Sequence, residues 1–223
     1  MPKITLTASD GHQLGAFRVD PEGAPRGGIV VLQEIFGVNE HIRDICYRLA
    51  ELDYVAIAPA LFDRVSPDFE SGYSESEIAH ARTFLAHADW DGFVRDTEAA
   101  VTELSSVGHV GVTGFCMGGS VAFLAATRLE TVACASGFYG GKIDAFADEV
   151  PNCPVQLHYG SEDQGIPMDN VEHVRARRGN DCEIFVYEGA GHGFHCDQRA
   201  NFHPKASAQA WQRTLGLFNA NIV

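Results

Sequence analysis

Two hydrophobic patterns alternate along the chain. Short runs such as 28–33 (GIVVLQ) are almost continuously apolar, which is typical of strands buried on both faces of a sheet. Between such runs, apolar residues recur at helical spacing, as in Ile42, Ile45 and Leu49. The alternation indicates βαβ units and predicts a three-layer α/β fold with a mostly parallel central sheet.

The first twenty residues break this alternation. Residues 4–7 and 14–19 flank Ser9-Asp10-Gly11, and an Asp-Gly turn between two such runs predicts an antiparallel hairpin. No repeat or linker follows, so we expect a single domain over residues 1–223. Further strands are expected over residues 28–33, 54–58, 107–113, 131–136, 155–160 and 183–187, and helices over 42–52, 74–87, 90–104, 120–127 and 204–219.

Composition and charge narrow the possible partners. The net charge of −14 argues against nucleic acids and anionic membrane surfaces, because both are bound through an excess of Lys and Arg. No run approaches the roughly 18 apolar residues of a membrane span, and the first residues lack a signal-peptide pattern. The six cysteines contain no C-x-x-C pair, as in a reducing compartment. We expect a cytoplasmic monomer or small homo-oligomer that acts on a small molecule.

The segment Gly114-Phe115-Cys116-Met117-Gly118 carries the clearest chemical signal. It joins a predicted strand to a predicted helix and has the G-x-S-x-G form of a nucleophile elbow, with cysteine in place of serine. The turn is sharp, so the flanking glycines allow the strand and the helix to approach. A thiol at a helix N-terminus is activated by the helix dipole. The structural alternative for Cys116 is a buried packing thiol.

Two later loops supply partners for this thiol. Asp163 and His192 each follow a predicted strand, and the order nucleophile, acid, histidine is that of α/β-hydrolases. His192 would take the thiol proton and Asp163 would orient the imidazole. Alternatively, Asp163 caps a turn while the neighbouring Glu162 is the acid, and His192 makes a backbone hydrogen bond.

An oxyanion hole is expected beside the nucleophile. Its donors would be the backbone N–H of Met117 and one N–H from the loop after the first buried strand, which we assign to Ile35.

With these motifs in place, the chain resembles the dienelactone hydrolase (carboxymethylenebutenolidase) family of α/β-hydrolases over nearly its full length. That family opens lactone rings with a Cys-His-Asp triad through a thioester, so the resemblance implies a carboxylic ester hydrolase with catalytic Cys116, Asp163 and His192, and no cofactor or metal. The matching segments are Ser9-Asp-Gly-His12, Gln33-Glu-Ile-Phe-Gly-Val-Asn39, Gly114-Phe-Cys-Met-Gly-Gly119, Gly137-Phe-Tyr-Gly140, Tyr159-Gly-Ser-Glu-Asp163 and Ala190-Gly-His-Gly-Phe194.

The resemblance also assigns a role to Glu34. In the family, a glutamate at this position contacts the resting thiol and moves when substrate binds. A carboxylate there disfavours the thiolate, so the enzyme would rest as a less oxidisable thiol. The structural alternative is a loop acceptor.

Substrate contacts are less well defined by the sequence. The family holds a substrate carboxylate with two arginines, and this chain departs from both positions. Arg199 is the nearest arginine after the histidine loop, and Arg82 is the candidate on the helix after Ser74. Arg82 could equally be a solvated helix residue. An aromatic pocket is expected from Phe36, Phe138 and Tyr139, each of which could instead belong to the core.

Three other functions compete with this interpretation. A broad carboxylesterase or thioesterase could use the same triad, and a non-catalytic redox or binding protein could use Cys116 as a thiol sensor. The third is a zinc-binding function, but the cluster around the histidine loop matches no usual spacing of zinc ligands. That cluster contains His192, His195, Cys196, Asp197 and His203.

Overall fold

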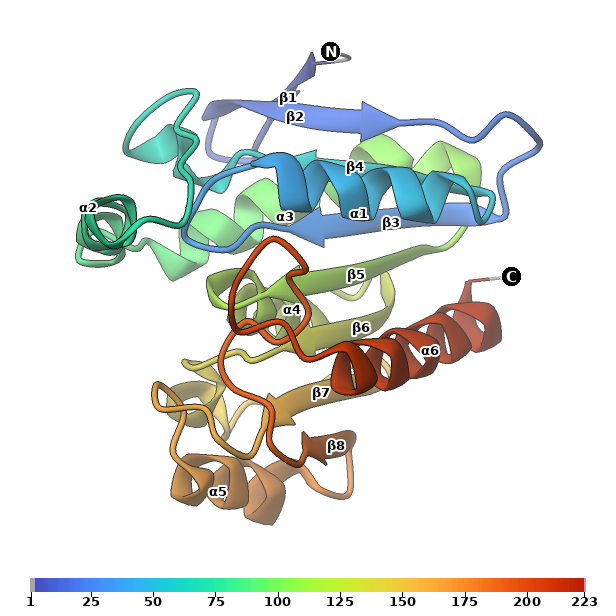
Figure 1. Cartoon of the computed structure of the whole chain (residues 1–223). Helices are drawn as coiled ribbons and strands as arrows, with labels where there is room; N and C mark the ends of the chain where they lie inside the picture. The colour runs from blue at the N-terminus through green and yellow to red at the C-terminus, as the bar shows by residue number, and fades with distance from the viewer. Residues whose placement is uncertain (1–2, 223) are drawn as a thin grey trace.

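The computed structural model describes residues 3–222, and the eight strands found there form one sheet in the order β1-β2-β4-β3-β5-β6-β7-β8 (Figure 1). β3 to β8 run parallel, whereas β2 pairs antiparallel with both β1 and β4. The strands are β1 (Lys3–Thr7), β2 (Gln13–Val19), β3 (Gly27–Leu32), β4 (Tyr54–Pro59), β5 (Val110–Phe115), β6 (Val132–Phe138), β7 (Val155–Gly160) and β8 (Cys182–Tyr187).

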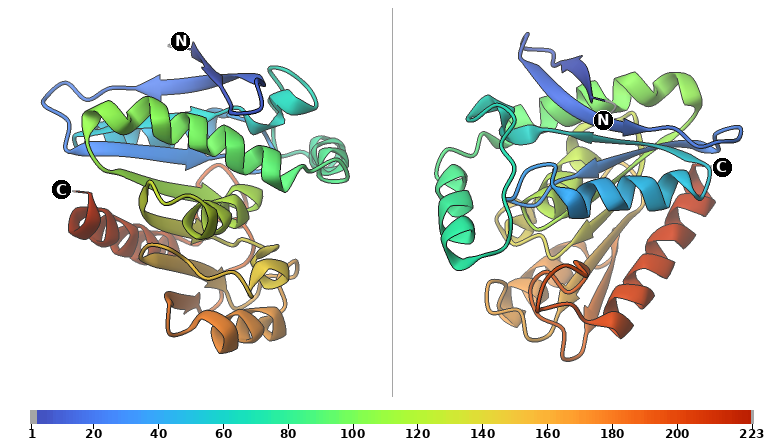
Figure 2. Two further views of the ribbon diagram at one scale, coloured as in Figure 1. Left: turned by 180° about the vertical axis from the view of Figure 1, so that it is seen from behind. Right: turned by 45° about the horizontal axis from the view of Figure 1, so that its top comes forward.

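Helices cover both faces of this sheet. α1 and α6 pack on one face, and α3 and α4 pack on the other (Figure 2). α2 lies apart from the sheet, on the side where the parallel strands end (Figure 1). The helices are α1 (Glu40–Ala50), α2 (Glu75–Leu85), α3 (Trp90–Leu104), α4 (Met117–Arg128), α5 (Met168–Arg178) and α6 (Pro204–Asn221), with short 3-10 turns η1 (Leu61–Arg64), η2 (Ser105–Val107) and η3 (Ile143–Phe146).

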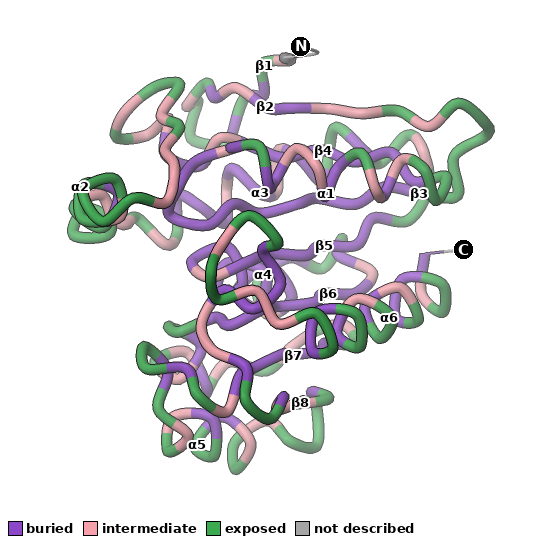
Figure 3. Tube along the Cα trace, in the orientation of Figure 1, coloured by how far each residue is buried: buried purple, intermediate pink, exposed green. Residues whose placement is uncertain are grey.

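The core lies in the centre of the sheet. β3, β4, β5 and β7 are buried at every position, and the trace in Figure 3 shows this central region almost entirely buried. α2 differs, since Ala81 is its one buried residue. This helix therefore adds little to the core, and most of its side chains are exposed at the side of the molecule where the parallel strands end.

The predicted fold is confirmed: a mostly parallel sheet carries an antiparallel hairpin at its N-terminal end. The capping box at Ser74 is present, with Glu77 closing it. α2 ends at Leu85 rather than near residue 87. β6 continues past residue 136, because Gly137 and Phe138 pair with β7. Within residues 3–222, no helix combines the length and the apolar character needed to cross a bilayer.

Candidate active site

Cys116 sits at the point where β5 gives way to α4. It is the N-cap residue of α4, and its backbone has φ 55° and ψ −114°, a conformation that non-glycine residues rarely adopt. Its N–H donates to the carbonyl of Phe138 at 3.0 Å, which ties the turn to β6. The strained elbow expected from the sequence is therefore present.

The glycines around Cys116 are required by close backbone approach. A Cβ on Gly114 would overlap the carbonyl of Gly118. A Cβ on Gly118 would overlap the Leu32 carbonyl and lie 2.5 Å from that of Gln33. The Gly118 N–H in turn donates to the Gln33 carbonyl at 3.0 Å. The loop carrying Glu34 and Ile35 is thus held directly against the N-terminus of α4, as the proposed oxyanion hole of Met117 and Ile35 requires.

The loops after β7 and β8 bring an acid and a histidine together. His192 Nδ1 lies 2.8 Å from Asp163 Oδ2, and the Asp163 side chain is almost fully buried. Its other oxygen accepts from the N–H groups of Gly165 and Ile166 at 2.8 and 3.1 Å, which fixes the carboxylate. Asp163, and not Glu162, is therefore the residue paired with His192.

The imidazole also contacts the thiol. Burial alone would lower the pKa of His192, but the negative charge of Cys116 and the hydrogen bonds that the ring donates to the Asp163 carboxylate and to Cys116 outweigh this and raise the pKa to about 10. The three residues singled out from the sequence thus lie in one chain of contacts, Cys116 to His192 to Asp163. Such an arrangement suits a thiolate paired with an imidazolium.

Glu34 is buried near these three residues, and its side chain is directed toward Arg199. Its Oε1 accepts from Arg199 Nη1 at 3.3 Å. The guanidinium lies over the rings of Phe36 and Tyr73, at 5.5 Å from each centroid. In this structure Cys116 is paired with His192, so the contact expected between Glu34 and the resting thiol stays a prediction.

A cavity of about 620 Å³ opens beside His192. Arg82 from α2, Glu162 and Arg199 line it together with His192. Two guanidinium groups from distant parts of the sequence therefore face the same space as the imidazole. These two guanidinium groups give the cavity a local positive charge, although the net charge of the protein is −14.

The expected aromatic pocket of Phe36, Phe138 and Tyr139 stays a prediction. Of the described residues, those that line this cavity do not include Phe36, Phe138 or Tyr139, and all three rings are buried. Phe138 packs on Phe115 with centroids 4.8 Å apart and belongs to the core. Tyr139 lies behind His192, with centroids 5.1 Å apart, and Phe36 supports Arg199. The last two rings thus position polar groups of the site.

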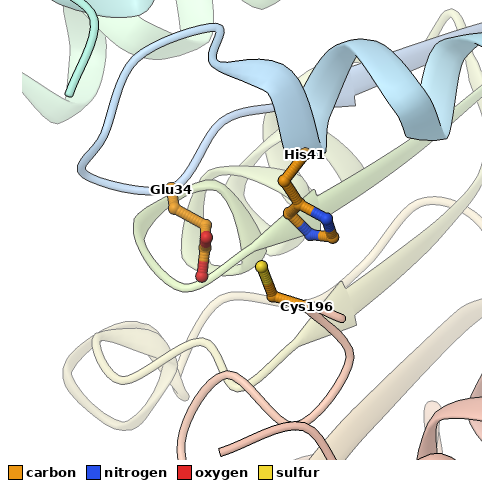
Figure 4. Close-up of side chains that lie close together, drawn as sticks. All are labelled: Glu34, His41 and Cys196. Atoms are coloured by element: carbon orange, nitrogen blue, oxygen red, sulfur yellow. The ribbon is translucent and has the colours of Figure 1, made fainter. Parts of the chain in front are cut away.

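The histidine-rich cluster after β8 is dispersed by the fold. His195 donates to or accepts from Ser207, Asp197 pairs with Arg48, and the His203 side chain caps α6. A different group converges instead, consisting of Glu34, His41 and Cys196 (Figure 4). No sequence signal marks His41, because one histidine in the first turn of an amphipathic helix carries no chemical pattern.

The fold has three layers, a sheet between two layers of helices, with an elbow at the end of β5 and a histidine after the last strand. These features define the α/β-hydrolase class. The dienelactone hydrolase family model matches residues 14–222, and the chain belongs to that family. It is therefore a hydrolase, and the carboxylic ester hydrolase class expected from the sequence fits it.

Named relatives agree with this assignment. A Pseudomonas putida protein named carboxymethylenebutenolidase is 32% identical, with 95% of this chain and 93% of that protein covered. A Synechocystis sp. protein named "Putative carboxymethylenebutenolidase" is 36% identical, with 87% and 86% covered. A Klebsiella pneumoniae crystal structure named "Putative Dienelactone Hydrolase" superposes with a TM-score of 0.84 at 30% identity, covering 98% and 99% of the two chains.

Proposed function

We propose that the protein hydrolyses lactones and enol esters through Cys116, His192 and Asp163, with a thioester intermediate. The observation that carries this proposal is the contact chain from the Cys116 thiol through His192 to the buried Asp163 carboxylate. Activated esters suit a cysteine nucleophile because their leaving oxygen departs more easily than an amine. The relative from Pseudomonas putida is named a carboxymethylenebutenolidase, and small lactones of that kind are the substrate class most compatible with this site.

The reaction divides into two steps at one sulfur atom. The Cys116 thiolate attacks the carbonyl carbon, and the backbone N–H groups of Met117 and Ile35 stabilise the resulting oxyanion. The C–O bond of the ester breaks, and the leaving oxygen takes the proton of the His192 imidazolium. His192 then removes a proton from water, which attacks the thioester, and breakage of the C–S bond releases the acid and restores the thiolate.

The test is a comparison of two cysteine variants. Cys116 and Cys153 are both partly buried, so Cys153→Ala is a matched control for loss of a thiol. We expect Cys116→Ala to lower kcat/KM for a dienelactone by about 10³-fold or more, and Cys153→Ala to leave it near the wild-type value. His192→Ala, incubated with substrate, should accumulate an adduct of acyl mass on Cys116 if acylation still proceeds slowly. An active Cys116→Ala enzyme would exclude the mechanism.

The two arginines of the cavity indicate that anionic substrates are preferred. Arg82 and Arg199 line the space beside His192, so a substrate carboxylate placed there would be neutralised. We expect Arg82→Ala to raise KM for a carboxylate-bearing lactone at least tenfold while leaving KM for a neutral nitrophenyl ester nearly unchanged. Equal changes for both substrates would reject this role, and equal turnover of both by the wild type would favour a broad esterase.

A further inference from the structure

Three buried side chains from separate segments converge next to the active site. Glu34 follows β3, His41 is in the first turn of α1, and Cys196 lies in the loop before α6 (Figure 4). One oxygen, one nitrogen and one sulfur atom of these residues lie within 4.8 Å of one another. Each residue is at least 98% buried. Such a group combines the three ligand types that proteins most often offer to zinc.

The hydrogen bonding of the group is incomplete. Neither ring nitrogen of His41 has a partner among residues 3–222, and Glu34 Oε2 has none either. Burying unpaired polar atoms is costly, by about 1–3 kcal/mol each, so their presence calls for a ligand. The Cys196 thiol has weak contacts, to the Tyr73 hydroxyl at 3.4 Å and with the backbone of Gln198.

We propose that Glu34, His41 and Cys196 form a binding site for a divalent transition metal of the zinc type. The mixture of thiolate, imidazole and carboxylate favours Zn²⁺ or Co²⁺ over Mg²⁺ or Ca²⁺, which prefer oxygen ligands alone. Three protein ligands leave a fourth position for water, as in open zinc sites. This proposal goes beyond ester hydrolysis and does not depend on the role of Cys116.

Ligation requires a defined proton balance. The Cys196 S–H bond breaks on binding, the proton goes to solvent and the sulfur lone pair bonds the cation. His41 is already placed for ligation, because neither of its buried ring nitrogens has a hydrogen-bond partner among residues 3–222. With the carboxylate of Glu34, the two anionic ligands neutralise a divalent ion.

An entry route and a link to catalysis follow from the neighbours. Tyr73, whose hydroxyl lies 3.4 Å from Cys196 Sγ, also lines a surface cavity of about 440 Å³ together with Asn39 and Gln198. A cation that reached the cluster would compete with Arg199 for the Glu34 carboxylate, which Arg199 holds in this structure. Metal occupancy and the arrangement of the active site are therefore coupled.

The experiment uses full-length Cys116→Ala protein, so that the thiol of the elbow cannot supply a ligand. After treatment with a chelator, the protein is titrated with Co²⁺ and then with Zn²⁺. We expect one equivalent of Co²⁺ to give the near-ultraviolet absorption of a cobalt–thiolate bond, and Zn²⁺ to displace it. No such absorption at one equivalent would overturn the proposal.

Variants in the same background assign the ligands. His41→Phe should fold normally, because His41 makes no hydrogen bonds and its ring packs edge-on against Phe115 at 5.5 Å. We expect it and Cys196→Ala each to weaken Co²⁺ binding by at least tenfold and to remove or shift the thiolate band. Cys46→Ala removes another buried thiol outside the cluster and should bind Co²⁺ like its parent. Unchanged binding in His41→Phe, or equal loss in Cys46→Ala, would place the metal elsewhere.

Discussion

The backbone conformation of Cys116 depends on residues that have no side chains. Its φ of 55° is tolerated because Gly114 and Gly118 have no side chains, so the backbones of β5, α4 and the loop after β3 pack directly against one another. The same conformation aims the thiol out of the helix N-terminus toward His192. Strain at one residue is thus maintained by close packing at its neighbours, as is common at functional sites.

A pair of glycine substitutions tests this dependence. In Gly118→Ala the new Cβ would overlap the carbonyls of Leu32 and Gln33, so we expect the free energy of unfolding to fall by about 3 kcal/mol or more. Gly216→Ala in α6 meets nothing within 4 Å and should raise it by about 0.5–1 kcal/mol, because alanine restricts the unfolded chain. Urea denaturation measures both. A Gly118→Ala protein as stable as Gly216→Ala would contradict the packing argument.

The raised pKa of His192 predicts how activity changes with pH. In the proposed mechanism the His192 imidazolium protonates the leaving oxygen, and the pKa of His192 is raised to about 10 in the folded protein. The acid form therefore persists above neutral pH, and kcat/KM should decline as pH rises through about 10 and not near 6.5.

Asp163→Asn gives the matched test of this pH dependence. The variant loses the charge that supports the imidazolium but keeps a side chain of the same size beside His192. We expect the alkaline limb of the kcat/KM profile to move to lower pH and the maximum to fall. The measurement is a pH profile corrected for spontaneous hydrolysis. An unchanged limb would show that Asp163 does not act through His192.

The residues of the proposed triad carry clearer sequence signals than the proposed substrate contacts. Cys116, Asp163 and His192 are each marked by a local pattern at the end of a strand, and a parallel sheet gathers such ends at one edge. The position of Arg199 depends on how the loop before α6 crosses Phe36 and Tyr73, which no local pattern encodes. For Phe138 the sequence left both a pocket position and a core position open, because an aromatic residue after a strand gives no sign of which way it faces.

At the scale of elements, a buried ion pair joins η1 to α3. Arg64 donates to both oxygens of Asp96 at 2.7 Å, and the Asp96 side chain is fully buried. Arg64 also contacts Asp10 in the turn between β1 and β2. One guanidinium therefore connects the N-terminal hairpin, η1 and α3, which are far apart in the sequence.

Removing one partner of this pair should be costly. Arg64→Ala leaves the Asp96 carboxylate buried without a counter-ion, and we expect the free energy of unfolding to fall by about 3–5 kcal/mol. Adding Asp96→Asn to that variant removes the stranded charge and should restore part of the loss. The control is Arg128→Ala. Arg128 bridges the exposed Asp91 and the partly exposed Glu149, so its loss should cost less than about 1 kcal/mol. Equal losses for Arg64→Ala and Arg128→Ala would be inconsistent with this account.

Helices and strands with a clear period were predictable, and the connection that carries Arg64 was not. Ser74 and Glu77 announce the start of α2 through their capping box. The segment between the expected strand 54–58 and the expected helix 74–87 has no clear period, yet it contains η1, and its Glu70 forms a bridge with Gly37. Arg43 holds this segment by pairing with Glu70, a long-range contact that has no signature in either local sequence.

At the scale of the whole molecule, the two tryptophans report on opposite faces of the sheet. Trp90 begins α3, and Trp211 lies in α6 on the other face (Figure 2). Trp90 packs on Phe146 and Trp211 packs on His195, so each fluorescence signal depends on local tertiary structure. The chain has no other tryptophan. Single-tryptophan variants therefore follow the unfolding of each layer separately.

We expect both layers to unfold together. All eight strands of the described region belong to one sheet, and the buried residues form one continuous core, so neither helical layer can leave without exposing the other's packing surface. In urea, Trp211→Phe and Trp90→Phe should each show a fluorescence midpoint equal to its own circular dichroism midpoint. A Trp211 signal that changes at lower urea than the dichroism of the same variant would show that the half of the sheet around β6 to β8, which supplies Asp163 and His192, opens independently. The site would then be assembled from two cooperative units, and the single domain expected over residues 1–223 would be wrong.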